Sequence, residues 1–509
     1  MKDIDLKKLN EADKLIREIA TEFGLSFMPQ EFDVVSAQKM LEILAYRLPV
    51  NYSHWSFGRD YEIERTKYEH GYSVPYEVVF NSDPARAYLM DTNPLPIQVL
   101  VMAHVYAHND FMKNNRHFQI TRRDMITSAS EAAQRFRKYE EDYGRRAVED
   151  IIDSSMAIQW NIDPEELIRP ETEEETRERL YGWSGILPAQ GDFNDLLPEK
   201  KRINSEQKRK LRVKTPPEPT IDILKYVIEN SPILRHEWQK DILSTIRGQA
   251  LYFMPYRRTK IMNEGWATYW HEKIMNRLFA EKFLSSEEHG YYNLYNARVK
   301  AHNPRSINPY LIGSALFKNI EMRWNTGRFG PEYEACTDAL KKKNWDLHLN
   351  KGLAKIMEVR RTHMDWFFID EFLNREVIED LQLYIYQESD KGTHIDVEVK
   401  VTDWEKVKKV LVQSLMNWGI PRIQVVDGNY ANSSQLYLSH QFEGLPLDDE
   451  YCKKTLEHIY SLWGRPVHLE TRNPSNQSEK AFYSADHNGV RAQMEEKVDE
   501  QNYIDLFSF

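Results

Sequence analysis

Cysteine is nearly absent from this chain of 509 residues, and long apolar runs are missing. The two cysteines, Cys336 and Cys452, lie far apart in the sequence, which argues against a disulfide framework and a thiolate metal cluster. No stretch approaches the roughly 20 apolar residues that a membrane-spanning helix needs. The N-terminus is charged and amphipathic and has no apolar signal core. We therefore expect a cytoplasmic protein without a membrane span.

Basic residues are also fewer than acidic ones, with 68 lysines and arginines against 79 aspartates and glutamates. The net charge of −11 and the pI near 5.9 argue against a nucleic-acid-binding protein. No glycine-rich phosphate loop follows a strand, so nucleotide chemistry has no motif support. No histidine has a glutamate three residues before it, which excludes the paired motif of bundle di-iron proteins.

Two histidines four residues apart, His104 and His108, form the first candidate site. Residues at this spacing share one face of a helix, and imidazole nitrogens are good zinc ligands. A glutamate from a distant helix would complete the ligand set of a zinc peptidase and leave one position open for water. Such enzymes carry their general-base glutamate directly after the first histidine, where this chain has Val105. The pattern predicts a divergent site; a structural polar network is the alternative.

The distant glutamate is predicted to be Glu264, in the motif Asn263-Glu-Gly-Trp-Ala-Thr-Tyr-Trp-His271. Seven residues, or two helical turns, separate Glu264 from His271, so both lie on one helix face. We predict Glu264 as the third zinc ligand and His271 as a catalytic group or further ligand. The alternative is that Glu264 stabilises the start of its helix, paired with Arg257, Arg258 or Lys260.

Five more residues are candidates around this centre. Glu237 and Asp241 are four apart on one helix face and would supply the missing base or hold the histidines. Asp110, His54 and His236 are predicted to lie around the ligands. The alternatives are salt bridges of Glu237 and Asp241 with neighbouring basic residues, and packing of His54 in an aromatic core.

The periodicity predicts a mainly helical body over residues 1–375. It includes an amphipathic helix at 3–24, a strand at 76–80 that ends in the turn Asn81-Ser-Asp-Pro84, and a helix from about Pro96 to Lys113. A strand, a turn and a histidine-bearing helix in this order are typical of a zincin-like core. Residues 170–219 change from acidic to basic and end in Thr215-Pro-Pro-Glu-Pro219, which predicts a mobile surface excursion.

The remainder of the chain has a different pattern. Over residues 380–475, strands and helices are predicted in the order βαββαβ, with strands at 395–401, 423–426, 436–442 and 467–471 and helices at 404–418 and 447–463. This order is that of a ferredoxin-like sandwich. Residues 476–509 are predicted to be a polar tail. The fold class is therefore α+β.

Long motifs of this chain, in order, resemble the stage V sporulation protein R (SpoVR) family over residues 10 to 475. The matching stretches are Asn51-Tyr-Ser-His-Trp-Ser-Phe-Gly58, Asn81-Ser-Asp-Pro84, Ala103-His-Val-Tyr-Ala-His-Asn-Asp-Phe111, His236-Glu-Trp-Gln239, Lys260-Ile-Met-Asn-Glu-Gly-Trp-Ala-Thr-Tyr-Trp-His271, Asn308-Pro-Tyr-Leu-Ile-Gly313, Gly327-Arg-Phe-Gly330 and Phe368-Ile-Asp370. The chain departs from the family pattern at Gly248, Gln249, Tyr256 and Ala107, which would weaken the metal site if lost acidic residues belonged to it.

The resemblance implies a role in spore-cortex formation in the mother-cell cytoplasm, with other sporulation or cortex-assembly proteins as partners. The motifs add the hypothesis of a zinc-dependent hydrolase that attacks an amide in a peptide or a cell-wall precursor. The alternative is a non-catalytic scaffold or regulator of cortex assembly. The sequence does not specify the substrate or the oligomeric state.

Overall fold

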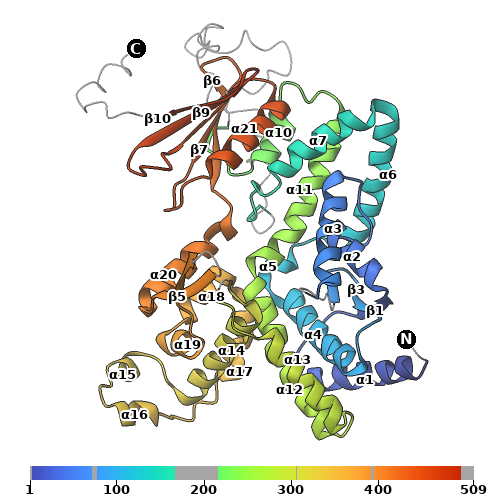
Figure 1. The fold of residues 1–509 in the computed structure, drawn as a ribbon, viewed down its shortest axis with the longest axis vertical. Helices are drawn as coiled ribbons and strands as arrows, with labels where there is room; N and C mark the ends of the chain where they lie inside the picture. The colour runs from blue at the N-terminus through green and yellow to red at the C-terminus, as the bar shows by residue number, and fades with distance from the viewer. Residues whose placement is uncertain (1–2, 72–76, 167–215, 305, 391–394, 495–509) are drawn as a thin grey trace, which may run out of the picture. The chain divides into compact units, whose positions relative to one another are not determined.

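The computed structural model describes residues 3–71, 77–166, 216–304, 306–390 and 395–494 (Figure 1). The excursion predicted at 170–219 lies outside these residues except for its last four. The fold is α+β, as predicted. Two compact units are formed, each from segments distant in the sequence: unit 1 (Met1–Ala133 and Tyr252–Gly419) and unit 2 (Gln134–Leu251 and Ile420–Phe509). The chain is thus divided differently from the consecutive domains 1–375 and 380–475 that the sequence predicted.

Unit 1 contains most of the helices and two small sheets. Its elements are α1 (Asp3–Glu22), β1 (Gln30–Val35), α2 (Ala37–Tyr46), α3 (Trp55–Glu69), β2 (Glu77–Phe80), β3 (Ala85–Met90), α4 (Leu95–Asn114), α5 (Arg116–Gln119), α12 (Lys260–Ala280), α13 (Ser286–Val299), α14 (Pro309–Thr326), α15 (Pro331–Glu334), α16 (Ala339–Lys343), α17 (Gly352–Thr362), α18 (Asp365–Phe372), α19 (Arg375–Asp380), β4 (Ile385–Asp390), β5 (Ile395–Val401), α20 (Trp404–Leu415) and the 3₁₀ turn η3 (Met416–Gly419). Helices α6 (Met125–Tyr143) and α11 (Glu237–Arg258) each have residues in both units.

The first sheet of unit 1 has the order β1-β3-β2. Strand β1 runs parallel to β3, from the pair Gln30–Ala85 to the pair Val35–Met90, and β2 runs antiparallel to β3. The predicted strand, turn and helix are confirmed as β2, the turn at 81–84 and α4, but β3 was missed between the turn and the helix. Its polar Arg86 and small Ala85 and Ala87 give a weak strand signal.

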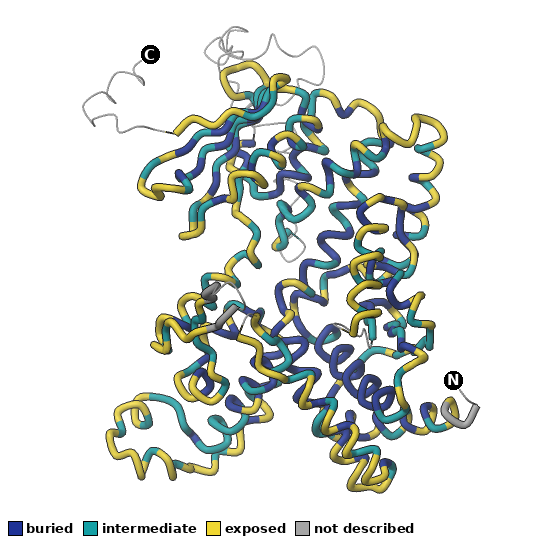
Figure 2. The backbone as a smooth tube through the Cα atoms, in the orientation of Figure 1, coloured by how far each residue is buried: buried dark blue, intermediate teal, exposed yellow. Residues whose placement is uncertain are grey.

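Two helices, α4 and α12, form the centre of unit 1. Every residue of α4 from Ile97 to Met112 is buried, and α12 is buried from Ile261 to His271 (Figure 2). A helix buried on all sides must place its polar residues against other polar groups. The histidine and glutamate motifs lie on these helices, so their side chains must find partners inside the unit.

Helices α12 and α14 approach each other closely at a pair of glycines. A Cβ atom on Gly265 would meet the backbone of Gly313 and come within 2.8 Å of the backbone nitrogen of Ser314. Only glycine allows two helix backbones to lie this close. This contact brings the start of α14 next to the residues that precede Gly265.

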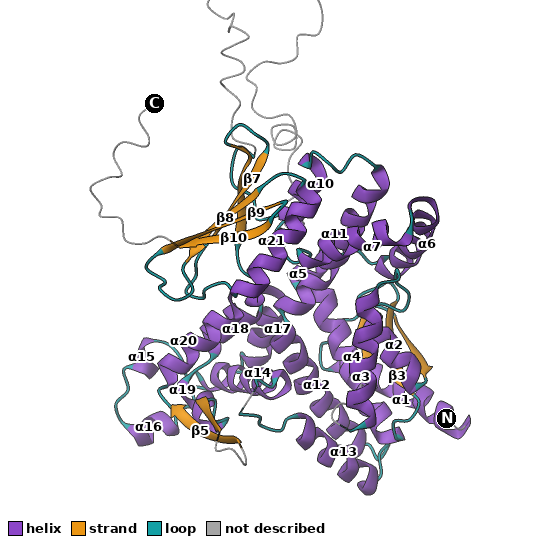
Figure 3. Cartoon of the chain, turned by 45° about the horizontal axis from the view of Figure 1, so that its top comes forward, coloured by secondary structure: helices purple, strands orange, loops and turns teal. Residues whose placement is uncertain are grey.

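Unit 2 has one larger sheet and the helices around it. Its elements are α7 (Arg145–Ala157), α10 (Ile223–Asn230), β6 (Ile423–Tyr430), β7 (Gln435–His440), α21 (Asp449–Trp463), β8 (Val467–Arg472), β9 (Lys480–Asp486) and β10 (Gly489–Met494). The strand order is β10-β9-β8-β7-β6, with β7 and β8 parallel and the other neighbours antiparallel. Helix α21 packs on this sheet (Figure 3) and ends at Gly464, which has a left-handed backbone.

The ferredoxin-like order predicted for residues 380–475 is not what the described strands form. Strand β5, the first of the predicted pattern, pairs with β4 in a separate two-stranded sheet, and α20 packs on α18 within unit 1. The predicted strands and helices are present, but β4 was missed and the helix predicted at 404–418 ends at Leu415. Alternation shows which face of a strand is apolar, but it does not identify the strand's partner.

The prediction of a polar tail over residues 476–509 is wrong for its first part, because β9 and β10 belong to the sheet of unit 2. Ala481, Tyr483 and Ala485 alternate along β9 and are buried, and the Tyr483 hydroxyl donates to Asp449 at 2.9 Å. The polar run after Pro474 concealed this short alternation. Residues 495–509 lie outside the described part of the chain.

Candidate metal centre

The two histidine-bearing turns of α4 face the start of α12. Pro94 precedes α4 and Pro96 lies in its first turn, where a missing backbone N–H is tolerated. The start of α12 is held by Asp365, whose carboxylate accepts from the backbone nitrogens of Ile261 (2.8 Å) and Met262 (2.9 Å). Asp365 therefore caps the helix, and Glu264, one turn further on, is free to point towards α4.

The structure brings His104, His108 and Glu264 together, although Glu264 is 160 residues from His104. The Glu264 Oε2 atom lies 3.3 Å from His104 Nε2 and 3.5 Å from His108 Nε2. A second carboxylate, Glu77 from the start of β2, places Oε1 3.8 Å from His104 Nε2. All four side chains are largely or fully buried, with Glu77 the most exposed at 17%.

These separations suit a zinc ion. Zinc bonds to nitrogen and oxygen are about 2.0–2.1 Å long, so two ligand atoms of a tetrahedral site lie roughly 3.3 Å apart. Glu264 Oε2 stands at this separation from both imidazoles. Glu77, His104 and His108 also form a group whose ligand atoms all lie within 4.8 Å of one another. Two imidazoles and two carboxylates are a donor set that zinc accepts.

A chain of hydrogen bonds determines which nitrogen of His104 faces this point. The Asn296 amide donates to Glu272 Oε1 at 2.9 Å, so its carbonyl oxygen is the atom 3.0 Å from His271 Nε2, which must donate. Burial lowers the pKa of His271 to about 3, which keeps the ring neutral and leaves Nδ1 as an acceptor. His104 Nδ1, 2.9 Å from His271 Nδ1, is then the donor. The remaining nitrogen of His104, Nε2, points at the carboxylates with a lone pair or a second proton.

His108 is oriented in the same sense. Its Nδ1 lies 2.8 Å from the Asn263 side-chain oxygen, which can only accept, so Nε2 is the nitrogen that faces Glu264. Burial lowers the pKa of His108, but the negative charge of Glu264 outweighs it and leaves the pKa above its ordinary value. Both imidazoles thus present Nε2 to one carboxylate oxygen. A proton or a metal ion must lie between these acceptors.

The two carboxylates differ in their electrostatic surroundings. Burial raises the pKa of Glu77. Burial acts in the same direction on Glu264, but Lys260 and His108 hold its pKa well below the usual range. The Lys260 ammonium forms an ion pair with Glu264 Oε1. Lys260 is 59% exposed and Glu264 is 8% exposed, so this lysine marks the solvent side of the cluster.

Tyr310 completes the cluster from the first turn of α14. Its ring stacks near His104, with 6.0 Å between centroids, and its hydroxyl lies close enough to Glu264 to feel the charge of the carboxylate. The charge of Glu264 and burial raise the pKa of Tyr310, so the hydroxyl remains a donor. The Asn308 side chain caps the start of α14, because its oxygen accepts from the backbone nitrogens of Tyr310 and Leu311.

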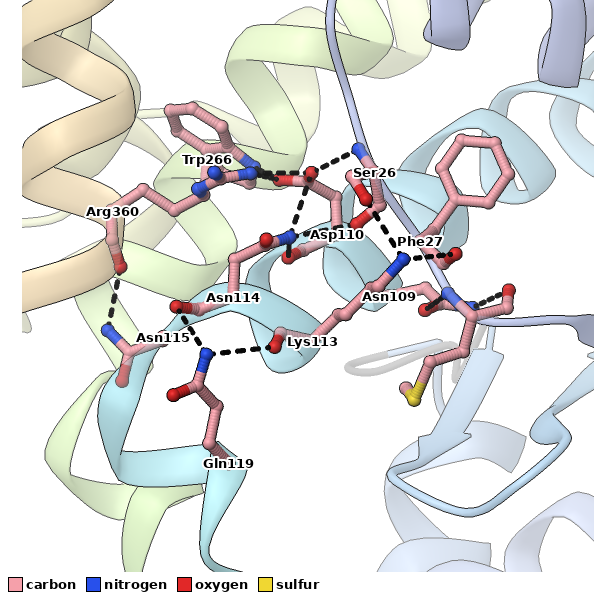
Figure 4. A network of polar contacts seen from close by, with 11 residues as sticks. Ser26, Phe27, Asn109, Asp110, Lys113, Asn114, Asn115, Gln119, Trp266 and Arg360 are labelled. Atoms are coloured by element: carbon pink, nitrogen blue, oxygen red, sulfur yellow. Dashed lines mark hydrogen bonds and ion pairs between the residues drawn. The ribbon is translucent and has the colours of Figure 1, made fainter.

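Asp110 was predicted to lie around the ligands, but its carboxylate belongs to a different hydrogen-bond network. Its carboxylate accepts from Arg360 Nη1 at 2.6 Å, from Trp266 Nε1 at 2.9 Å and from the Ser26 backbone at 2.7 Å (Figure 4). The Asp110 side chain is fully buried and Arg360 is 7% exposed. This ion pair joins α4, α12, α17 and the segment after α1.

Glu237, Asp241 and His236 lie in unit 2 and bind other partners. The Glu237 side chain is 90% exposed and pairs with Lys240, one of the alternatives that the sequence left open. Asp241 accepts from Arg135 at 2.9 Å and from Tyr139 at 3.0 Å. His236 is exposed. None of the contacts described for these residues involves the histidines of α4.

His54 caps α3. Its Nδ1 lies 2.8 Å from the Ser56 hydroxyl and accepts from the Ser56 backbone nitrogen, and its ring contacts Trp55 and Phe57. Of the positions that depart from the family pattern, Gly248 and Gln249 lie in α11 within unit 2. The Tyr256 hydroxyl accepts from the backbone nitrogen of Asn81.

Sequence reasoning missed Glu77, Asn296 and Tyr310. Glu77 had a signal, because it is the charged residue in the apolar strand Glu-Val-Val-Phe80 that precedes the turn. Tyr310 had a weaker one, its place in the Asn308-Pro-Tyr motif. Asn296 gave none, since an asparagine in an exposed-looking helix is unremarkable.

Comparison with known proteins identifies the family. The family described as "SpoVR like protein" matches residues 3–420, and the "SpoVR-like C-terminal domain" matches residues 421–474. The chain belongs to the SpoVR-like family. The limit between the two matches coincides, within one residue, with the limit between Gly419 of unit 1 and Ile420 of unit 2. This SpoVR-like chain is also 29% identical over 493 residues to "Uncharacterized protein YcgB" of Escherichia coli (strain K12), which covers 90% of each chain.

No solved structure matches this SpoVR-like chain. The zincin-like character of its core therefore stays a prediction, carried by the cluster of side chains. Among the described residues, no helix combines the length and the apolar character needed to cross a membrane.

Proposed function

We propose that this SpoVR-like protein is a zinc-dependent amide hydrolase whose metal is held by His104, His108 and Glu264. The observation that carries the proposal is the meeting of two imidazole Nε2 atoms and a carboxylate oxygen at zinc-like separations in a buried place. A bound zinc ion would supply an acidified water and polarise a carbonyl group. Lys260, which is 59% exposed, is the part of the cluster nearest to solvent, and a substrate would approach from its side.

Glu77 is the residue that we assign as general base. Val105 stands where zinc peptidases carry their general-base glutamate and cannot act as a base. The carboxylate of Glu77 can replace it, because it reaches the His104 side of the cluster from β2. Its distance of 3.8 Å from His104 Nε2 is longer than that of Glu264, which suits a group that binds the water more than the metal. A carboxylate beside the water can take its proton and later give it to the leaving amine.

His271, Asn296 and Glu272 position His104. Glu272 is held as a carboxylate: burial raises its pKa, but hydrogen bonds from Lys300 and Lys318 bring it to about 2. From this fixed charge the chain of hydrogen bonds runs to His104 and leaves its Nε2 directed at the metal position. Groups of this kind fix the tautomer and orientation of metal-binding histidines.

The test is metal analysis of the purified full chain. We expect about one zinc ion per chain in the wild type, and loss of that zinc in the double variant His104→Ala/His108→Ala, with the fold retained by circular dichroism. The control is His54→Ala, a buried histidine that caps α3, which should keep its zinc. A folded wild-type protein that binds no zinc, even after dialysis against it, refutes the proposal.

Hydrolysis is tested separately. Glu77→Gln should retain zinc and lose the release of new amino groups from peptide and cell-wall muropeptide mixtures, because the amide cannot act as a base. Equal release by wild type and Glu77→Gln would remove Glu77 from the reaction.

The family name supports a proposal for the biological setting. We propose that the substrate belongs to spore-cortex formation in the cytoplasm of the mother cell, with other cortex-assembly proteins as partners. A spore-forming strain that carries Glu77→Gln should then form spores with defective cortex. A normal cortex in that strain would show that the proposed hydrolase activity is not needed for cortex formation.

A non-catalytic scaffold of cortex assembly is the second candidate, and one observation favours it. The ammonium of Lys260 already neutralises Glu264, and Asn263 and His271 bind the histidines, so the cluster can close without an ion. The variant Lys260→Met distinguishes the two. In an enzyme, removing the competing cation should tighten zinc binding. In a scaffold, it should only lower the thermal stability, with no zinc bound before or after.

A further inference from the structure

Tyr310 places a neutral hydroxyl beside the cluster, and its position is specified by several features. Asn308 accepts from the backbone nitrogens of Tyr310 and Leu311, which fixes the start of α14. Pro309 occupies the first helical position. The ring lies at 29° to that of His104, with 6.0 Å between the centroids, and the hydroxyl lies within the electrostatic reach of Glu264.

The glycine contact between α12 and α14 explains why the phenol reaches the metal position. Gly313 lies three residues after Tyr310, on the same side of α14, and Gly265 directly follows Glu264. Because these two glycines bring the helix backbones together, the turns that carry Tyr310 and Glu264 lie close to each other, and the charge of Glu264 acts on Tyr310. A larger residue at either glycine would separate the hydroxyl from the carboxylate.

Lys260 and Tyr310 both lie beside Glu264, and they differ in what they can do. Lys260 carries a charge, and moving it away would leave a buried carboxylate without its counter-ion, which is expensive. The hydroxyl of Tyr310 is neutral, so turning it towards a substrate leaves no charge without its counter-ion. Tyr310 is therefore the donor that can turn to a substrate.

We propose that Tyr310 donates a hydrogen bond to the carbonyl oxygen of the substrate as that oxygen gains negative charge. The inference rests on the proposed amide hydrolysis. Water adds its oxygen to the carbonyl carbon and gives one proton to Glu77, while the electron pair of the carbonyl bond moves to the oxygen that Tyr310 faces. That pair returns as the C–N bond breaks, and the amine leaves with the proton from Glu77. The products are a carboxylic acid and an amine.

This role predicts selectivity for ligands that carry a carbonyl oxygen. A donor positioned for a developing oxyanion typically contributes strongly to the transition state. It should also strengthen binding of a hydroxamate, whose carbonyl oxygen occupies the same place. It should not affect a simple thiol, which binds the metal through sulfur and has no carbonyl group.

The experiment compares Tyr310→Phe with the wild type after replacement of zinc by cobalt, with the cobalt absorption spectrum as readout. Both proteins are titrated with acetohydroxamate and with 2-mercaptoethanol. We expect one cobalt ion in each, acetohydroxamate binding weaker by about 10-fold in Tyr310→Phe because one hydrogen bond to a charged group is lost, and unchanged binding of 2-mercaptoethanol. The control, Tyr292→Phe, removes the hydroxyl of a buried tyrosine whose ring contacts His271, and should bind both ligands as the wild type does.

Each other outcome overturns the inference. If both ligands weaken together, or if the variant loses its metal, Tyr310 only positions Glu264. If acetohydroxamate binds equally well, or does not bind the metal-loaded wild type, Tyr310 is no donor to a carbonyl oxygen. A wild-type chain that takes up neither zinc nor cobalt refutes the proposed function itself, which the metal content reports before any titration.

Discussion

Replacing Gly265 with alanine should destabilise unit 1 and disturb the metal centre together. The new Cβ would lie within 3.0 Å of three backbone atoms of α14, and the most distant of these, Ser314 N, is only 2.8 Å away. Ordinary van der Waals contact begins at 3.4 Å and the nearest atom, Gly313 Cα, would lie at 2.3 Å, so α14 must move away from α12 by about 1 Å. Backbone atoms cannot turn aside as a flexible side chain can.

The cost can be estimated from general values. Overpacking a close contact costs typically about 1–3 kcal/mol, and a contact with backbone belongs at the upper end. Alanine gains up to about 1 kcal/mol over glycine inside a helix. The net loss is then roughly 2 kcal/mol, which lowers the melting temperature by about 3 °C for a unit of about 300 residues.

The assay is thermal unfolding of Gly265→Ala beside a matched control, Gly290→Ala. Gly290 lies in α13, is exposed, and has no atom within 4 Å of the position of its Cβ. The control should be unchanged or slightly stabilised, because it gains only helix propensity. Zinc affinity should fall in Gly265→Ala, because Tyr310 and Glu264 separate, and should stay constant in the control. Equal melting temperatures for the two variants would refute this account of the helix contact.

Two further predictions concern groups away from the zinc ligands. Arg360→Met should lower the free energy of unfolding by about 3–5 kcal/mol in chemical denaturation, because Asp110 would remain buried without its counter-ion. The zinc content of the folded variant should not change. Loss of zinc from the folded variant would show that Asp110 does contribute to the metal centre. The pKa of His117 is lowered by burial to about 3, below its unfolded value of 6.5, so its neutral form stabilises the fold above about pH 6.5 and this contribution is lost as the pH falls towards 3. His117→Asn should therefore reduce the loss of unfolding free energy between pH 7 and pH 5 by about 2 kcal/mol. The control His302→Asn, at an exposed histidine, should leave this loss unchanged. If the unfolding free energies of the two variants depend on pH in the same way, the assignment to His117 is wrong.

The local elements of this protein were readable from its sequence. The strand before the turn at 81–84, the histidine-bearing α4 and the helix α21 with its stop at Gly464 all follow from apolar periodicity and terminal residues. These signals act over a few residues, within the reach of one helical turn or one strand pair. The pairing of His104 with His108 is of this kind.

Which elements meet was decided by tertiary packing. The two glycines on α12 and α14 gave no sign in the sequence that they face each other, yet their contact places Tyr310 at Glu264. Strand β5 alternates as well as any strand of unit 2, but it pairs with β4 in unit 1. Alternation records the environment of a side chain and says nothing about which distant segment provides that environment.

The sequence by itself determined a helix with two imidazoles on one face, a distant helix bearing a glutamate, and membership of a family. Only the tertiary structure decided that Glu77 joins them, that Asp110 instead binds Arg360, and that His271 orients His104. The physical reason is that a buried polar group must find its partner through space, and that partner can come from any part of the chain that the hydrophobic core brings near.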